Sequence, residues 1–471
     1  MPNLTLKLNI TTIVNPRYLL QLQFTRYFSG FITSIDFDGT LYSYTIWGKD
    51  YDIYLPAEID KIDFNYNFDD KLIIPGIWNL SIFDNNSVLD ELFFENNPTP
   101  LDVGQYYAPD LSNPVKALLY KIGDHERFEF PLDVNHTPFF SGYVYMKSLG
   151  FDDFTKMFSL SVQPDIELLK KADIHNLKAA RADAEEIPDQ HLSFRDNLYY
   201  LLQVAFPELK RENITIEHEF VFCAHSNPDL SHFSSNPNTI FAAGSISEYS
   251  IHELYFNVRD ISNRLGINSC HEILKSLCFS YFATLTVTHN KATFASINKS
   301  FRTDKTFNAN RSVFSFTKEV SFERLEWIRV TEVSANSHLS HTIGTQSELT
   351  NGFDKNIALV TIMNFAVSQG VTKYILSSPL KVKDGQNNLL HVIFAKESTT
   401  ATDYKTFRKL LATLWYNYLN KYSSGKIYHF QVDSVDFDFT QSIGYHDRLY
   451  SPVGIHYDIV DNSTTIDAVR N

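Results

Sequence analysis

The most informative stretch of this sequence begins with FSGYVYM at Phe140–Met146, which predicts a β-strand. Gly150–Asp153 supplies turn residues, and FSLSV at Phe158–Val162 then alternates apolar and polar residues as a return strand does. Pro164 ends that strand, and the acidic and apolar residues of Asp165–Leu169 predict a short helix directly after it. The stretch therefore predicts a β-hairpin that is followed by a helix.

Alternating segments lie on both sides of this hairpin. Leu4–Ile10 alternates cleanly and predicts a half-buried strand. Asp38 and Gly39 stand between two alternating runs and predict a hairpin turn, because both residue types tolerate positive φ. Tyr457 and its neighbours form one arm of a final hairpin that ends near Ala468. The 38 Phe and 26 Tyr fit a β-rich chain, since aromatic residues favour strands.

Three segments have helical periodicity instead. Apolar residues recur at helical spacing over 194–205, and 402–419 is amphipathic over its whole length. Ser269 and Glu272 form an S-x-x-E capping box, which predicts the start of a third helix. A hairpin follows that helix directly, so helices and antiparallel strands share the same region. The pattern predicts a β-rich α+β fold.

Composition and charge exclude several classes of protein. The net charge of −14 argues against general nucleic-acid binding, which needs clustered Lys and Arg. No apolar run reaches the ~18–20 residues of a membrane span, and the N-terminus does not resemble a signal peptide. The three cysteines, Cys223, Cys270 and Cys278, have no metal-binding spacing, so we expect neither a zinc site nor a disulfide framework.

The string IDFDGTL at Ile35–Leu41 is the sharpest enzyme-like motif. It resembles the first motif of the haloacid dehalogenase phosphatases, in which two carboxylates hold Mg²⁺. By that match Asp36 would be the nucleophile and Asp38 the acid/base. The flanking segments are β on both sides, however, and no β-α alternation follows. The alternative interpretation is a hairpin turn, which we favour.

Other polar groupings are weaker. His271 and Glu272 lack the second His of a helical zinc-protease motif. Cys223 and His225, with His232 beyond them, lie in or beside a Ser/Asn-rich loop without a third catalytic group. We therefore predict no catalytic, cofactor-binding or metal-binding residues, and no cofactor.

A further acidic grouping lies near the C-terminus. Asp433, Asp436 and Asp438 could suggest calcium. Asp436 and Asp438 alternate with Phe, which is typical of a solvated strand face. We favour the strand.

The order of elements carries a resemblance that no single motif does. The segments Phe140–Val144, Phe158–Val162 and Ile166–Leu169 resemble the strand, turn, return strand and short helix that close the first β-domain of baseplate hub proteins of tailed bacteriophages. The helix and hairpin from Ser269 are similar to the α+β domain of that family, and Ile443–Val469 to its terminal hairpins. The resemblance covers about 55–470 and leaves the first residues unmatched.

The resemblance implies a tail hub architecture with two β-barrel-like domains plus two α+β domains. We divide the chain into an N-terminal β segment of unknown role (1–55), a first hub β-barrel domain (56–175), an α+β domain (176–305), a second β-rich hub domain (306–400) and a C-terminal helix with closing β-hairpins (401–471).

The resemblance also implies a function. The chain would be a structural virion protein and not an enzyme, forming a homotrimeric ring at the tail tip that adapts the sixfold tail to a threefold tip. It would serve DNA ejection and host cell attachment, and would be made in the host cytoplasm. Its partners would be the distal tail protein, the tape-measure protein, the tail tube and a central spike or fibre. Wall-degrading activity would belong to another protein.

Assembly is also expected on physical grounds. Short strands with free edges and abundant aromatic residues are costly to leave exposed in a monomer. Interfaces of ~2,000 Å² or more would cover them. Two alternatives remain open at this point, namely the Mg²⁺-dependent phosphatase and a receptor- or glycan-binding tail protein.

Overall fold

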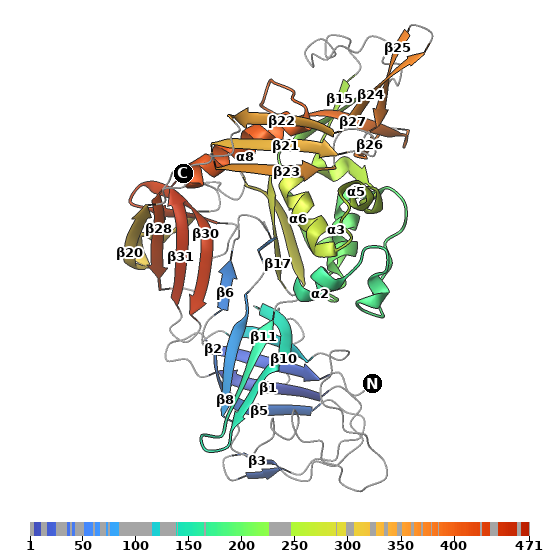
Figure 1. Ribbon diagram of the computed structural model, residues 1–471. Coiled ribbons are helices and arrows are strands. Elements are labelled where there is room, and N and C mark those ends of the chain that lie inside the picture. The colour runs from blue at the N-terminus through green and yellow to red at the C-terminus, as the bar shows by residue number, and fades with distance from the viewer. Residues whose placement is uncertain are drawn as a thin grey trace.

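The computed structural model shows a β-rich α+β chain with an elongated outline (Figure 1). Its β-rich α+β character confirms the fold class predicted from the sequence. The residues that the structure describes are 4–10, 17–24, 35–37, 40–42, 51–59, 62–65, 72–73, 76–83, 115–122, 138, 140–163, 166–225, 246–288, 290–297, 306–320, 326–333, 338–345, 351–358, 362–368, 371–377, 379–384, 386–423, 426–433, 441–458 and 463–470.

A closed barrel forms one end of the molecule (Figure 1). Its strand order is β1-β2-β9-β10-β11-β8-β5, and the parallel pair of β1 with β5 closes the ring. Closure leaves no free strand edge in this sheet. The strands are β1 (Leu4–Ile10), β2 (Arg17–Phe24), β5 (Tyr51–Ile59), β8 (Trp78–Phe83), β9 (Lys116–Ile122), β10 (Phe140–Asp152) and β11 (Met157–Gln163).

The hairpin of β10 and β11 confirms the strand and the return strand predicted from the sequence. The turn predicted at Gly150–Asp153 is wrong in position: Gly150 and Asp152 still pair with β11, and the chain turns at 153–156. Phe158, Leu160 and Val162 are buried, while Ser159 is exposed, so the alternation faces the barrel interior as expected. The predicted helix follows as α2 (Ile166–Lys171). A break in register between Tyr145 and Gly150 makes β10 bulge away from its partner.

The two glycines of β10 differ in how closely they are approached. A Cβ at Gly142 would lie 2.5 Å from the backbone oxygen of Gln163, whereas a Cβ at Gly150 would meet only the Ser159 hydroxyl. Backbone cannot move aside as a side-chain end can. Gly142 is therefore required for the close pairing of the two strands.

The middle of the chain forms an α+β body around an extended apolar core. One sheet has the order β13-β18-β17-β7 and another β12-β16-β26-β27-β14-β15. The helices are α3 (Phe194–Leu202), α5 (Val258–Leu265) and α6 (Cys270–Ser280); the strands are β7 (Leu72–Ile73), β12 (Leu192–Ser193), β13 (Ile214–Glu217), β14 (Val221–His225), β15 (Ile246–Tyr249), β16 (Leu254–Phe256), β17 (Ala283–Thr288), β18 (Lys291–Ser296), β26 (Lys381–Lys383) and β27 (Leu389–Lys396); the 3-10 turns are η1 (Leu177–Ala179), η2 (Arg211–Asn213) and η3 (Ile251–Glu253).

The helix predicted from Ser269 is present as α6, but its capping box is not formed. The Ser269 hydroxyl donates instead to the carbonyl oxygen of Leu169, 3.1 Å away, and makes no capping hydrogen bond. Glu272 lies 3.6 Å from Lys275. The serine is used to attach α6 to the end of α2, so a long-range contact replaces the local one that the sequence suggested.

A three-stranded sheet and a long helix lie beside this body. The sheet has the order β22-β21-β23, with β21 (Trp327–Val333), β22 (His338–Gly344) and β23 (Gly352–Ile357). The helix α8 (Phe407–Ser423) packs against β21 and β22. Its predicted inward face is buried as expected: Phe407, Leu410, Leu411, Leu414, Tyr418 and Leu419.

The C-terminal sheet curls on itself. Its order is β19-β29-β30-β31-β28-β20, and its two edge strands, β19 and β20, are consecutive in the chain. Only residues 309–312, which include the turn η5 (Ala309–Arg311), join them. Because so few residues span less than ~20 Å, the two edges must lie close together. The strands are β19 (Thr306–Asn308), β20 (Val313–Val320), β28 (Lys426–Val432), β29 (Ser442–Tyr445), β30 (Arg448–Asp458) and β31 (Ser463–Arg470).

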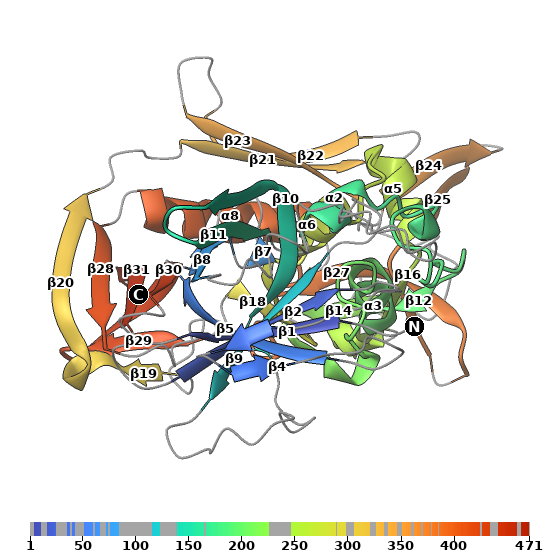
Figure 2. The same cartoon turned by 90° about the horizontal axis from the view of Figure 1, so that it is seen from below.

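Aromatic side chains fill the inside of this curled sheet. Phe316 of β20 lies 4.9 Å from Phe430 of β28 and 5.1 Å from Tyr445 of β29, measured between ring centroids. Tyr450 of β30 lies 5.0 Å from Phe430. The edge strand β20 and β29, which neighbours the other edge strand, therefore share one aromatic core, as a curled sheet requires. Figure 2 shows the curled path of these strands.

Some pairings join parts that are distant in sequence. The strand β6 (Ile62–Asn65), which follows β5 of the barrel, pairs with β30 of the C-terminal sheet. β7 pairs in parallel with β17, and β27 pairs with β14. Strands from 1–55 and from 56–175 also share the barrel. Several sheets therefore combine strands from different segments of the five-part division that we made from the sequence.

Two hairpins pair with no other described strand. They are β3 (Ile35–Phe37) with β4 (Thr40–Tyr42), and β24 (Ile362–Ser368) with β25 (Val371–Ser377). Within the described ranges, no helix is long and apolar enough to cross a membrane.

The contrast between the two glycines of β10 is testable. Gly142→Ala should lower the free energy of unfolding by about 1–3 kcal/mol, because the added carbon overlaps backbone atoms. Gly150→Ala should have a smaller effect, since the Ser159 hydroxyl can rotate away. Urea unfolding monitored by circular dichroism measures both. Equal losses for the two variants would contradict this account of β10.

Candidate functional site

The structure places the phosphatase-like motif on a small hairpin. Asp36 lies on β3, which pairs antiparallel with β4, and Asp36 stands opposite Leu41. Asp38 and Gly39 fall between the two strands and lie outside the described residues. The hairpin prediction is confirmed. A phosphatase of that family would instead need Asp36 at the end of a strand in a parallel sheet with flanking helices.

Among the histidine and cysteine candidates, His271 and Cys223 have described side chains and lie on different elements. His271 and Glu272 are neighbours on α6, with Nδ1 3.2 Å from Oε1. Cys223 is buried on β14, and burial raises the pKa of its thiol to about 12. A thiol with such a pKa is protonated and is a poor nucleophile at neutral pH. His225 ends β14, and His232 lies outside the described residues.

Of the three acidic C-terminal candidates, the structure describes Asp433. The backbone N–H of Asp433 donates to Ser312 at 2.9 Å, which fastens the end of β28 to the connection between the two edge strands. Asp436 and Asp438 lie outside the described residues. Over the part of the chain that is described, no three His, Cys, Asp or Glu residues are grouped so as to hold a metal ion.

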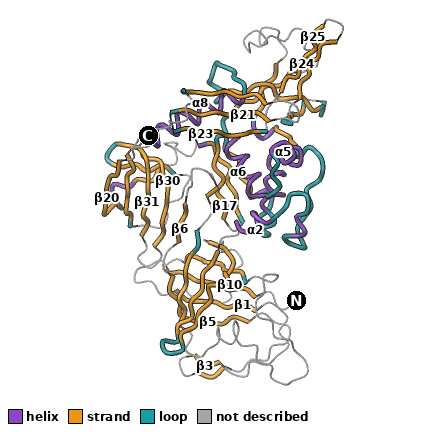
Figure 3. The backbone as a smooth tube through the Cα atoms, viewed as in Figure 1, coloured by secondary structure: helices purple, strands orange, loops and turns teal. Residues whose placement is uncertain are grey.

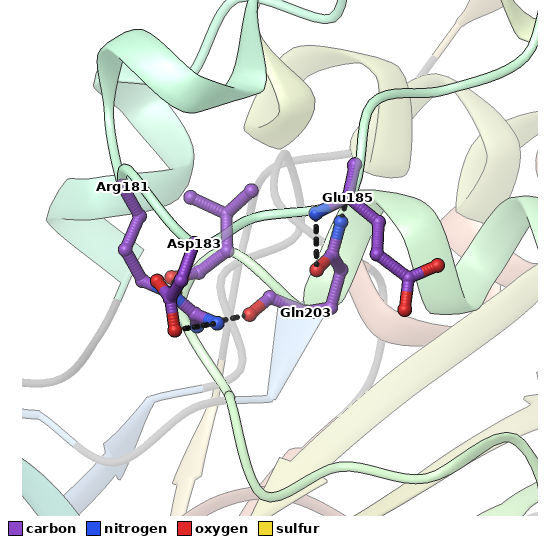
Figure 4. A network of polar contacts seen from close by, with 5 residues as sticks. Arg181, Asp183, Glu185 and Gln203 are labelled. Carbon is purple, nitrogen blue, oxygen red and sulfur yellow. Dashed lines mark hydrogen bonds and ion pairs between the residues drawn. The ribbon is translucent and has the colours of Figure 1, made fainter.

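A polar network fastens the charged segment that contains Arg181, Asp183 and Glu185 (Figure 4). The guanidinium of Arg181 lies 2.6 Å from Asp183 and also donates to the carbonyl oxygens of Gln203 and Val204. The Gln203 amide in turn donates to the Glu185 carbonyl at 2.6 Å, and accepts from the Glu185 N–H at 3.1 Å. The hydrogen bond from Arg181 lowers the pKa of Asp183. The network anchors this segment to the end of α3.

A second cluster joins β15, β27 and the segment between β27 and α8. Lys396 is almost fully buried, and its Nζ lies 2.8 Å from Glu248 and 5.0 Å from the ring centroid of Tyr404. The Tyr404 hydroxyl also donates to Glu248. Burial opposes ionisation of Glu248, yet the hydrogen bonds from Lys396 and Tyr404 outweigh it and lower the pKa of this carboxyl. Every charge in the cluster has a partner, as a structural cluster requires.

A buried ion pair holds α8 on the three-stranded sheet. Glu332 of β21 is fully buried, with one carboxylate oxygen 2.8 Å from Arg408 Nη1 and the other accepting from the Arg408 N–H at 3.3 Å. The carboxylate therefore caps the first turn of α8. Desolvation outweighs Arg408 and raises the pKa of Glu332 to about 7.

A fourth group crosses the outer surface of the C-terminal sheet. Asp467 of β31 lies 2.6 Å from His429 Nδ1 and 3.8 Å from His456 Nε2, and His429 lies 3.5 Å from Glu319. The hydrogen bond from His456, followed by that from His429, holds the pKa of Asp467 below its usual value. These side chains link β20, β28, β31 and β30, so they too stabilise the sheet.

The four groups share one character. Each carboxylate or cation contacts an opposite charge or a hydrogen-bond partner, and each group joins elements that are distant in sequence. Sequence reasoning missed them because long-range pairs leave no local spacing. The arrangement suits a scaffold whose parts are fastened together.

The exposed apolar residues are the other candidates for function. Phe154 is 100% exposed at the turn between β10 and β11, Phe314 is 62% exposed on β20, and Phe83 is 44% exposed on β8. Exposed large apolar side chains favour contacts with other proteins when they gather at one place.

The comparisons with known proteins found no matching family model and no matching curated protein. Among solved structures, the chain is similar to the 43 kDa tail protein of prophage MuSo2 from Shewanella oneidensis, at 10% identity and a TM-score of 0.40, over 92% of this chain and 96% of that one. It is also similar to a tail protein from Neisseria meningitidis, at 9% identity and 0.41, over 96% of both chains. Prophage tail protein gp18 from Listeria monocytogenes follows at 7% and 0.35, over 88% of both. Likeness at this level carries no functional argument.

The pKa of Glu332 predicts a dependence of stability on pH. Its folded pKa of about 7 lies above the ordinary value of 4.5, so the neutral carboxyl favours the folded state. This contribution, on the order of 3 kcal/mol, is fully present below pH 4.5 and is lost as the pH rises through 7. Glu332→Gln should remove it, so the variant should lose less stability than wild type between pH 4.5 and 8. Urea unfolding across that range measures the difference.

Asp467→Asn provides the matched control. The folded pKa of Asp467 is lowered, so its contribution is present above the ordinary value of 3.8 and is lost as the pH falls. The two variants should therefore change the pH profile in opposite directions. Parallel profiles for wild type and Glu332→Gln would refute the assigned role of Glu332.

Proposed function

We propose that this chain is a structural tail protein of a tailed bacteriophage that forms the baseplate hub ring at the tail tip. The supporting observation is that one chain carries a closed barrel and a second, curled sheet whose edges are joined by only four residues. Three copies would supply six β units around one axis. A homotrimer of this kind would adapt a sixfold tail to a threefold tip.

The strand β6 supports a defined spacing between the two units. β6 follows the barrel strand β5 in the sequence. It pairs with β30 of the curled sheet over four residue pairs, from Gly454 to Tyr457 on β30. A paired strand orients its neighbours through several hydrogen bonds, which a flexible linker does not. In the proposed ring, the two units of a subunit are the first and second hub domains.

The remaining parts complete the proposal. The α+β body lies beside the β units and would contact the central spike or fibre, while the ring would contact the distal tail protein, the tape-measure protein and the tail tube. The net charge of −14 suits a conduit for DNA ejection, because like charge prevents phosphates from sticking. The five-part division of the chain and its role in host attachment belong to the same proposal.

A structural role also suits the polar clusters. Glu332 is buried beside Arg408 and Lys396 is buried beside Glu248, so each ion pair has one buried partner and ties two elements together. Catalytic groups are usually left accessible and incompletely paired for a substrate. We therefore propose that the chain is not an enzyme.

The oligomeric state tests this proposal. At micromolar concentration the purified chain should have about three times its 54.2 kDa mass, because the ring requires three copies. Light scattering coupled to size-exclusion chromatography gives the mass directly. A stable monomer at that concentration would exclude the hub ring and would favour a receptor- or glycan-binding protein.

The phosphatase alternative has its own test. Wild type and Asp36→Asn should both fail to release phosphate from a generic phosphomonoester with Mg²⁺, since Asp36 lies on an isolated antiparallel hairpin. An established phosphatase run in parallel controls the assay. Activity in wild type that disappears in Asp36→Asn would establish the enzyme instead.

A further inference from the structure

The three-stranded sheet of β22, β21 and β23 is attached to the rest of the molecule through one of its two faces. Among the described strands, these three pair only with one another. The inner face carries the buried residues Ile328, Val330 and Glu332 of β21 and packs on α8. Figure 3 shows the strands in orange beside the purple helix α8. Within the described ranges, side chains of the inner face rather than shared strands connect the sheet to the body.

Apolar contacts form part of this attachment. Ile343 of β22 and Phe353 of β23 pack against the core, and the Phe353 ring centroid lies 5.7 Å from that of Phe279 on α6. A sheet of three strands depends on such an apolar face for its stability. If the sheet left the body, it would lose these contacts, and its backbone N–H groups would become open to exchange with solvent.

The polar part of the attachment is the contact of Glu332 with Arg408. Both carboxylate oxygens of Glu332 contact Arg408 at the start of α8, at 2.8 Å and 3.3 Å. The Glu332 side chain is 1% exposed and that of Arg408 24% exposed. A buried carboxylate gives up its water, and one partly solvated cation does not fully replace that water. This imbalance is the cause of the raised pKa of Glu332, about 7.

The described charged groups that share this interface are cationic or become so. His341 of β22 and Lys355 of β23 both stand opposite Val330, so both lie on the inner face. On α8, Lys409 follows Arg408. Burial, followed by the charges of Lys409 and Arg408, lowers the pKa of His341. Protonation of His341 therefore weakens the attachment, so this residue opposes any effect of Glu332 in acid.

We propose that the three-stranded sheet is a flap, and that Glu332 with Arg408 is a latch that weakens when the Glu332 carboxyl group loses its proton. With the flap on α8, an ionised Glu332 remains without water; with the flap detached, the same carboxylate is solvated. Detachment would also uncover apolar side chains that the flap contacts, such as Phe279. The latch would thus make an apolar surface available as the pH rises.

The direction of the effect follows from the two states of the flap. The Glu332 pKa is about 7 when the flap is attached and returns to the ordinary 4.5 when it is detached. The contribution of Glu332 to attachment is therefore fully present below pH 4.5 and is lost as the pH rises through 7. The contribution of His341 has the opposite sign: it is present above the ordinary value of 6.5 and is lost as the pH falls.

Hydrogen exchange of the full chain, followed by mass spectrometry from pH 5 to 8, tests the latch. Exchange of the β21 amides, divided by the intrinsic rate at each pH, gives the opening constant of the flap. Gln is similar in size to Glu and stays neutral. The opening constant of wild type divided by that of Glu332→Gln should therefore rise on the order of 100-fold from pH 5 to 8. The same ratio for His341→Gln should rise as the pH falls below 6.5.

Glu319→Gln is the matched control, because Glu319 is an exposed carboxylate on β20 of another sheet. It should leave the exchange of β21 unchanged. A ratio for Glu332→Gln that stays constant with pH would overturn the latch. A parallel change in the amides of β10 and β11 in the barrel would overturn the flap, since Glu332 would then act on the whole chain. Neither result bears on the ring of three copies, which the mass of the purified chain tests separately.

Discussion

The short connection between β19 and β20 determines the shape of the C-terminal sheet. Residues 309–312 join the two edge strands of a six-strand path, so the sheet cannot lie flat. Curling then brings Phe316 of one edge against Tyr445 near the other and creates a shared aromatic core. The barrel solves the same problem differently, by pairing β1 with β5. Both solutions remove or shield strand edges, which would otherwise attract other chains.

The polar groups attach neighbouring parts of the molecule to one another. Arg181 fastens an irregular segment to α3, Glu332 fastens α8 to β21, and Asp467 fastens β31 to its neighbours. Breaking a buried pair leaves an uncompensated charge, so such contacts favour one arrangement of the parts over others. In the proposed hub ring, such internal attachments would keep the parts of each subunit in fixed positions.

The local features could be predicted from the sequence, and the long-range ones could not. The two strands of the β10–β11 hairpin and the buried face of α8 were predictable because alternation and helical spacing act over a few residues. The pairing of β6 with β30 joins residues that are far apart in the sequence and leaves no periodic signal. The predicted capping box at Ser269 was wrong for a related reason. The Ser269 hydroxyl donates to the carbonyl oxygen of Leu169, which is distant in the sequence. The candidate clusters at Lys396 and Glu332 likewise depend on contacts between distant strands and helices.

The central claim is that each chain supplies two β units to a closed ring of three copies. Electron microscopy of the purified protein tests it most directly, through the symmetry of averaged end-on views. We expect a ring with threefold symmetry in which six similar densities surround an open or filled centre. Single particles without rotational symmetry, each the size of one chain, would contradict the claim.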